Sequence, residues 1–142
     1  MSESTSSLDE TTELAESDED SGDTVKKLHG VAVTDNKGQI VLHPAAEGYH
    51  DLIQLLVEEG YAVCVDLCGA DHLGNATRVL PAAIEPERFE LVVNLLDVRT
   101  PRRLRVRVQI AESDPSIPTI SDIHPGAEAM ERETNDMFGV CF

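Results

Sequence analysis

The chain has 142 residues, 41% of them hydrophobic, with three cysteines and a formal net charge of −16 at pH 7. This length provides for one domain with a hydrophobic core, while the negative charge argues against a nucleic-acid-binding surface, which has to be basic. The odd number of cysteines argues against a disulfide framework, and no stretch approaches the ~18 apolar residues of a membrane span. We therefore expect a cytoplasmic, soluble chain that binds no nucleic acid and meets a membrane only through a partner.

The beginning of the chain carries much of the negative charge. Residues 1–24 contain nine Asp and Glu residues and no Lys or Arg, whereas the remainder carries 18 acidic and 11 basic residues. A segment so poor in apolar side chains cannot bury enough surface to offset the entropy lost on folding. We predict a disordered acidic tail over residues 1–24, which either solubilises the chain or recruits a partner, and one folded domain over residues 25–142.

Two short extended segments and a helix open the predicted domain. Val31–Thr34 and Gln39–Leu42 flank the turn-forming stretch Asp35–Gly38, which predicts a strand on each side of a turn. In Ala45–Glu59 the apolar residues recur at i, i+3 and i+4, which predicts a helix. Gly60 follows as its C-terminal stop.

Three further strands and a second helix follow in the sequence. Phe89–Val98 and Leu104–Ile110 predict two strands, and Ala127–Phe138 predicts a helix after the breaker Pro-Gly. Before them, Tyr61–Gly69 alternates in polarity, so its apolar set is expected on one face: Tyr61, Val63, Val65 and Leu67. This order predicts an α+β fold of two layers, in which helices pack on one side of a mainly antiparallel or mixed sheet.

Arginines are concentrated around the third of these strands. Five of the eleven basic residues lie within nine positions: Arg99, Arg102, Arg103, Arg105 and Arg107. Such a row is either a solvated face that guards the sheet against edge pairing or a docking edge for an acidic protein surface, where Arg binds carboxylates in bidentate fashion. A phosphate ligand is less favoured, because no glycine-rich loop accompanies the arginines.

The chain shows no pattern of a catalytic or cofactor-binding site. Cys64 and Cys68 would lie ~13 Å apart on a strand, and three cysteines are too few for the about four thiolates of an iron–sulfur cluster. The five histidines are scattered, and neither a nucleophile elbow nor a phosphate loop is present. We therefore expect no catalytic, cofactor-binding or metal-binding residues in this chain.

The predicted C-terminal helix is densely charged. At 100° per residue its apolar stripe is expected to contain Ala127, Met130, Thr134, Met137 and Phe138. Glu131 and Glu133 would flank this stripe on opposite sides, and Arg132 and Asp136 would form an i, i+4 ion pair on the outer face. Since the carboxylates diverge, they predict neither a metal site nor an acid–base pair. The pattern favours a helix that lies between two proteins.

From Arg88 to Phe142 the sequence resembles the thirty-kilodalton subunit family (the C subunit) of NADH:quinone oxidoreductase, respiratory complex I. The resemblance rests on RFELVVNLLDV, RRLRVRVQI and DPSIPTISDIHPGAEAMERETNDMFGV. The family signature corresponds to Glu131, Arg132, Glu133, Asp136, Met137, Phe138 and Gly139. Because the family pattern continues beyond this glycine, we expect a fragment or a naturally short variant that ends after the signature.

This resemblance implies an accessory subunit in the peripheral arm of a proton-translocating complex, on the cytoplasmic side of the cell membrane. The protein would pack against the large quinone-site subunit through its signature residues and support electron transfer from NADH to quinone. It would bind no cofactor itself, because the flavin and the iron–sulfur clusters belong to partner subunits and quinone binds at the partner's site.

Two alternatives remain open at this point. One is the equivalent subunit of a related membrane-bound hydrogenase, since those complexes use a similar protein. The other is a stand-alone acidic protein-binding module, whose N-terminal segment recruits a basic partner.

Overall fold

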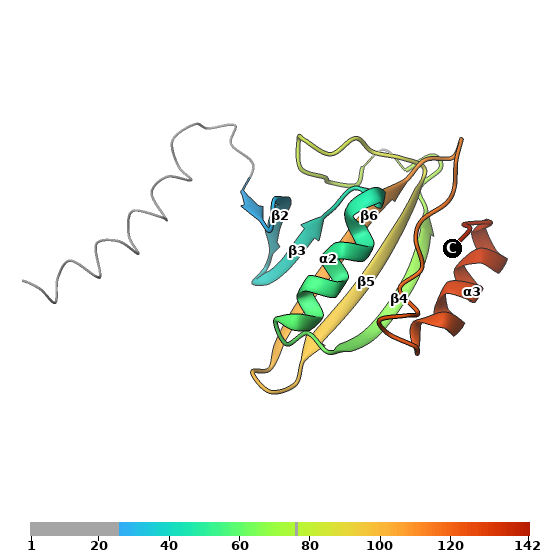
Figure 1. Ribbon diagram of the computed structural model, residues 1–142. Helices are drawn as coiled ribbons and strands as arrows, with labels where there is room; N and C mark the ends of the chain where they lie inside the picture. The colour runs from blue at the N-terminus through green and yellow to red at the C-terminus, as the bar shows by residue number, and fades with distance from the viewer. Residues whose placement is uncertain (1–25, 76) are drawn as a thin grey trace, which may run out of the picture.

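The computed structural model describes residues 26–75 and 77–142 (Figure 1). The predicted acidic tail, residues 1–24, lies outside this part. The elements of the described part are β1 Lys27–Leu28, β2 Val31–Asn36, β3 Gln39–His43, α2 Ala46–Glu58, β4 Val63–Asp71, β5 Phe89–Asp97, β6 Arg102–Ile110 and α3 Ala127–Phe138. Every strand and helix predicted from the sequence is present, with bounds that differ by three residues or fewer.

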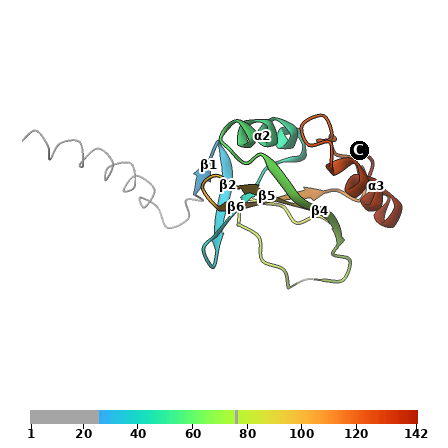
Figure 2. The same ribbon diagram turned by 90° about the horizontal axis from the view of Figure 1, so that it is seen from below.

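The strands form one sheet in the order β1-β2-β3-β6-β5-β4. All neighbours pair antiparallel except β3 and β6, which run parallel, so the sheet is mixed. Figure 2 shows α2 and α3 on the same side of this sheet, while the long loop between β4 and β5, described over residues 72–75 and 77–88, passes along the other side. The predicted α+β fold, with helices on one side of a mainly antiparallel sheet, is confirmed. We call the side without helices the open face.

The core lies between β5, β6 and α2. Leu91, Val93 and Leu95 on β5 pair with Val108, Val106 and Leu104 on β6, and all six side chains are at most 2% exposed. The stripe of α2 that covers them consists of Tyr49, Leu52, Ile53 and Leu56. Burying one such side chain contributes ~1.5–3 kcal/mol, so this cluster is the main stabilising contact between the helix layer and the sheet.

The hairpin of β2 and β3 turns at Lys37 and Gly38. Both residues have positive φ angles, 56° and 88°, which is the requirement of a two-residue hairpin turn with the twist of the flanking strands. The Gly38 N–H donates to Asp35 Oδ1 at 2.6 Å. The predicted turn over residues 35–38 is therefore present, although its first two residues belong to β2 and pair with residues of β3.

The predicted facing of β4 is wrong. A bulge between Cys64 and Asp66 shifts the register, so that Cys64 and Leu67 both stand on the core side, opposite Leu95 and Val93. An inserted residue moves all preceding side chains to the other face of a strand. For that reason Val63 and Val65 are 40% and 45% exposed, although the alternation predicts them on one face with Leu67, which is 2% exposed.

Helix α3 packs on β4 through a close contact at Gly69. A Cβ atom at this position would lie 2.6 Å from Thr134 Cγ2 and 3.0 Å from Phe138 Cδ2, which is closer than packed carbon atoms approach. Glycine is therefore the residue that lets α3 approach the sheet. The ring of Phe138 continues the contact toward Phe89, with ring centroids 6.4 Å apart.

We expect Gly69→Ala to lower the free energy of unfolding by ~1–3 kcal/mol, because the added methyl group overpacks the contact with α3. Gly48→Ala is the matched control, since nothing lies within 4 Å of a Cβ atom there and the site is in helix α2. That control should stabilise by ~0.5–1 kcal/mol. Chemical denaturation measures both, and equal effects of the two substitutions would refute the close contact.

A second prediction concerns pH and the buried His43. Burial and the nearby Arg107 charge lower the pKa of this imidazole from 6.5 to about 4, so the unfolded chain takes up a proton that the folded chain excludes. Stability is then fully present above pH 6.5 and declines as the pH falls toward 4, by ~3 kcal/mol in total. His43→Gln should remove this part of the pH dependence. Denaturation curves recorded at several values between pH 7 and pH 4 give the free energy of unfolding at each pH. An equal decline of this free energy with pH in both proteins would contradict the prediction.

Candidate functional site

Strand β6 places its arginines on the open face of the sheet. Leu104, Val106 and Val108 point into the core, so the alternating residues Arg103, Arg105 and Arg107 point to the opposite side. We call these three residues the arginine face. Because β6 is hydrogen-bonded to β3 on one side and to β5 on the other, it is an interior strand. The arginines predicted as a possible docking edge therefore lie on a face of the sheet, and docking through them stays a prediction.

Arg102, at the start of β6, is occupied within the chain. Its Nη2 donates to Asp97 Oδ2 at 2.8 Å and to the Glu59 carbonyl at 3.3 Å, and its guanidinium lies 4.7 Å from the centroid of the Tyr61 ring. The hydrogen bonds of Arg102 and Thr100 hold the pKa of the Asp97 carboxyl well below its usual range. Arg102 thus stabilises the turn between β5 and β6, while Arg99 in this turn is exposed.

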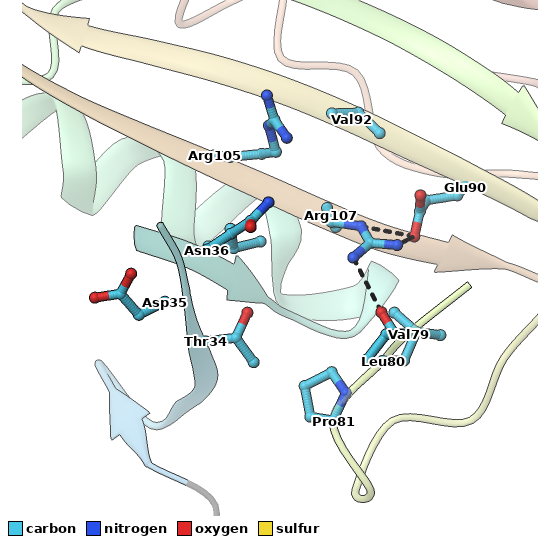
Figure 3. Close-up of a pocket in the computed structure, with 11 residues that line it drawn as sticks. Thr34, Asp35, Asn36, Val79, Leu80, Pro81, Glu90, Val92, Arg105 and Arg107 are labelled. Carbon is cyan, nitrogen blue, oxygen red and sulfur yellow. Dashed lines mark hydrogen bonds and ion pairs between the residues drawn. The ribbon is translucent and has the colours of Figure 1, made fainter. Parts of the chain in front are cut away.

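Arg107 is neutralised by a buried carboxylate. Its Nε and Nη2 lie 3.0 and 2.8 Å from Glu90 Oε2 (Figure 3), and Glu90 is only 3% exposed. Gln109 Nε2 donates to the same oxygen at 2.5 Å, and His72 Nε2 lies 3.3 Å from Glu90 Oε1. Burial alone would raise the pKa of Glu90, but these hydrogen bonds and the Arg107 charge outweigh it and lower the pKa.

Arg103 and Arg105 have no such partner. Arg105 Nε donates to the neutral Asn94 side chain at 2.9 Å, and Arg103 is exposed. Among residues 26–75 and 77–142, the ion pairs include neither of these two arginines. The arginine face therefore presents two positive charges that the described carboxylates do not neutralise.

A pocket of about 580 Å³ lies beside these arginines. Thr34 and Asn36 of β2, Arg105 and Arg107 of β6, and Pro81 of the long loop contribute to its walls (Figure 3). Its lining mixes hydrogen-bonding, charged and apolar groups. Glu90, one of the two carboxylates that line the pocket, is already engaged by Arg107 and Gln109, whereas Asp35 accepts a hydrogen bond from the Gly38 N–H.

On the other side of the sheet, helix α3 has a polar anchor. Glu131 is 4% exposed, and its carboxylate accepts hydrogen bonds from Thr119 Oγ1 at 2.6 Å and from the Ile120 N–H at 2.9 Å. These contacts hold the segment before α3 against the helix. Sequence reasoning placed Glu131 beside the buried stripe, whereas the structure places it inside. In the helix Ala127, Glu131 and Thr134 recur at i, i+4 and i+7, so these three residues share its buried face.

The outer face of α3 also differs from the prediction. Met137, assigned to the buried stripe, is 65% exposed. Arg132 does not pair with Asp136; its Nη2 lies 3.5 Å from Glu128 Oε1, and both side chains are exposed, so the contact contributes ~0.3–0.5 kcal/mol. The predicted divergence of the carboxylates is confirmed, because Glu131 points inward. We call four exposed residues of this helix that belong to the family signature the signature face: Arg132, Glu133, Asp136 and Met137.

Two polar clusters were not predicted from the sequence, one around Glu90 and one around Glu131. Glu90 stands in the apolar run of β5, and its partners Arg107 and Gln109 come from β6. A glutamate within an apolar strand, next in sequence to a strand of alternating arginines, is the signal that points to such a pair. The Glu131 anchor has no comparable signal, because Thr119 and Ile120 contribute a hydroxyl and a backbone N–H.

The described part shows little that would hold a metal or react as a nucleophile. No group of three or more His, Cys, Asp or Glu residues in it is arranged to hold a metal ion. The three cysteines are free thiols, and burial together with Asp66 raises the pKa of Cys64 to about 11. Neither described helix has the length and apolar character needed to cross a bilayer.

We expect Glu131→Ala to lower the free energy of unfolding by ~2–3 kcal/mol, because it leaves the Ile120 N–H and the Thr119 hydroxyl without an acceptor. Glu133→Ala, on the exposed side of the same helix, is the control and should change stability by ~0.5 kcal/mol or less. Thermal and chemical denaturation give both values. A loss for Glu131→Ala no larger than for Glu133→Ala would show that the anchor does not stabilise the fold.

Comparisons with known proteins agree on one family. The family described as "Respiratory-chain NADH dehydrogenase, 30 Kd subunit" matches residues 42–142. The C subunit of the NADH-quinone oxidoreductase of Sinorhizobium medicae (strain WSM419) is 32% identical over 124 residues, which cover 83% of this chain and 56% of that protein. Its counterpart in Roseiflexus castenholzii (strain DSM 13941 / HLO8) is 35% identical over 109 residues, covering 75% and 57%. The chain thus spans little more than half the length of these relatives.

Solved structures agree with this match. The structure described as "Nqo5 of the trypsin-resistant fragment (1-134) in P63 form" is similar with a TM-score of 0.69 and 27% identity, over 95% of this chain and 94% of that one. A chain of the membrane-bound sulfane sulfur reductase, an archaeal respiratory membrane complex, has a TM-score of 0.63 and 22% identity, over 94% of this chain and 70% of that one. The second likeness shows the fold alone.

Proposed function

Because the chain belongs to the 30 Kd subunit family of the respiratory-chain NADH dehydrogenase, we propose that it is an accessory subunit in the peripheral arm of a proton-translocating NADH:quinone oxidoreductase. In this role it packs against the large quinone-site subunit on the cytoplasmic side of the cell membrane. The flavin and the iron–sulfur clusters belong to partner subunits, and quinone binds at the partner's site. This chain helps to hold the large subunit in place and contributes no catalytic residue.

The signature face is the observation that supports this role best. Met137 stands 65% exposed among charged residues of α3, the helix that also carries Arg132. Arg and Met are both enriched at protein interfaces relative to the rest of the surface. The face is also rigid, because the Glu131 anchor and the Gly69 contact fix α3 on both sides, so little entropy is lost on docking.

The signature face can be tested with two exposed apolar residues. We expect Met137→Ala to weaken binding of the large subunit by about tenfold, which corresponds to ~1.4 kcal/mol of lost contact. Leu73→Ala is the matched control, since Leu73 is 70% exposed and lies outside α3, in the loop after β4. Recovery of the large subunit with the tagged chain from gently solubilised membranes measures both variants, and the unmodified chain should also recover NADH–quinone activity.

The same preparation separates the alternatives. A clean monomer, or an unchanged yield of partner with Met137→Ala, would count against the proposed interface. A large subunit that contains nickel would identify the hydrogenase relative instead. If deletion of residues 1–24 abolished every interaction, the chain would be an acidic binding module and the signature face would not be its docking site.

A further inference from the structure

The proposed docking through α3 leaves the arginine face unexplained. This face lies on the open side of the sheet, away from the helix layer that contains α3 (Figure 2). Its charges are extended by Lys37, which lines a hollow together with Arg103 and Leu96. Neighbouring residues on one face of a strand are ~6.5–7 Å apart, so Arg103 and Arg105 form a short positive row beside Lys37. We call these three residues the basic row.

Few carboxylates of the described part can neutralise this row. Glu90 is engaged by Arg107, and Asp97 by Arg102. Asp35 lines the pocket beside Arg105, but its Oδ1 accepts the Gly38 N–H, and Figure 3 shows its carboxylate turned away from the guanidinium groups. Asp66 on β4 pairs with Asn94 on β5, which places it two strands, ~10 Å, from Arg105. The basic row is therefore open to an acidic ligand.

The chain itself carries a ligand of matching charge. Residues 1–24 contain nine acidic and no basic residues, and four of the acids lie in the last seven positions of this segment: Asp18, Glu19, Asp20 and Asp23. Side chains of this kind pair with arginine through short, charge-assisted hydrogen bonds. This segment joins the described part at Lys26, directly before β1.

The strand register places the basic row within the length of chain that this segment provides. Lys27 pairs with Ala32, and Ala32 with His43, whose neighbour Leu42 pairs with Val106. The chain thus enters the sheet level with Arg107, three strands or ~14 Å away. Arg105 and Arg103 lie two and four residues further along β6, ~7–14 Å. The total of ~16–20 Å corresponds to about six extended residues, the separation between Lys26 and Asp20.

We propose that the acidic segment of residues 1–24 binds the basic row of the same chain and masks it. Tethering gives the segment an effective concentration in the millimolar range, so an intrinsic dissociation constant of ~0.1 mM is enough to populate the bound form about tenfold over the free form. An acidic partner then has to displace the segment before it can bind the basic row. Weakly acidic competitors do so poorly, so the row selects strongly acidic partners. This inference goes beyond the proposed function and does not depend on it, because the masking takes place in the isolated chain.

The test compares the full chain with two charge-neutralised forms. One form replaces the acids nearest the sheet (Asp18→Asn, Glu19→Gln, Asp20→Asn and Asp23→Asn), and the other replaces Arg103→Gln and Arg105→Gln. At low salt, where electrostatic pairs are screened least, we expect the NMR signals of the Arg103 and Arg105 Nε–H groups to shift when the acids are neutralised. Added salt should shift them in the same direction. The Nε–H signal of Arg132, exposed on α3, is the internal control and should stay unchanged when the four acids are neutralised.

A soluble octaglutamate peptide then measures how well the basic row is masked. We expect it to bind the form without the four acids about tenfold more tightly than the full chain, and to lose this binding when Arg103 and Arg105 are replaced. Arg132→Gln should leave the peptide affinity unchanged. Equal affinity for the full and the neutralised chain would overturn the proposal. Shifts that grow with protein concentration would also overturn it, because they would assign the contact to a second copy.

Discussion

β5 and β6 pair antiparallel at nine consecutive positions, from Phe89 opposite Ile110 to Asp97 opposite Arg102, and this register positions the core, the arginines and the loop. Side chains alternate across a strand, so one register decides both faces at once. Leu91 opposite Val108 on the core side requires Glu90 opposite Gln109 on the open side. A slip by one residue would bury the arginines under α2, which makes the register strongly specified.

The buried carboxylates Glu90 and Asp97 follow from the same pairing. Each is at most 3% exposed, and burying a carboxylate is costly unless it is paired and hydrogen-bonded. Arg107 and Arg102 on the neighbouring strand supply that pairing. These two arginines stabilise the sheet internally, whereas Arg103 and Arg105 form no ion pair within the described part. One cluster in the sequence therefore contains paired and unpaired arginines, which the charge pattern alone does not distinguish.

Helix α3 and the open face place the two candidate contact surfaces on different layers of the domain. The signature face is carried on a helix that Gly69 admits close to β4 and that Glu131 connects to the preceding segment. The basic row lies beyond the sheet from it.

The sequence by itself determined the elements, the α+β class and the family signature, because apolar periodicity and short motifs are local properties of the chain. It did not determine which β4 residues face the core, since a bulge at Val65 depends on pairing with β5. Nor did it show that β6 is an interior strand, because the parallel neighbour β3 lies some sixty residues earlier. The burial of Glu131 and the exposure of Met137 were likewise decided by tertiary structure: only the packed segment at Thr119 and Ile120 provides the donors that make a buried carboxylate stable.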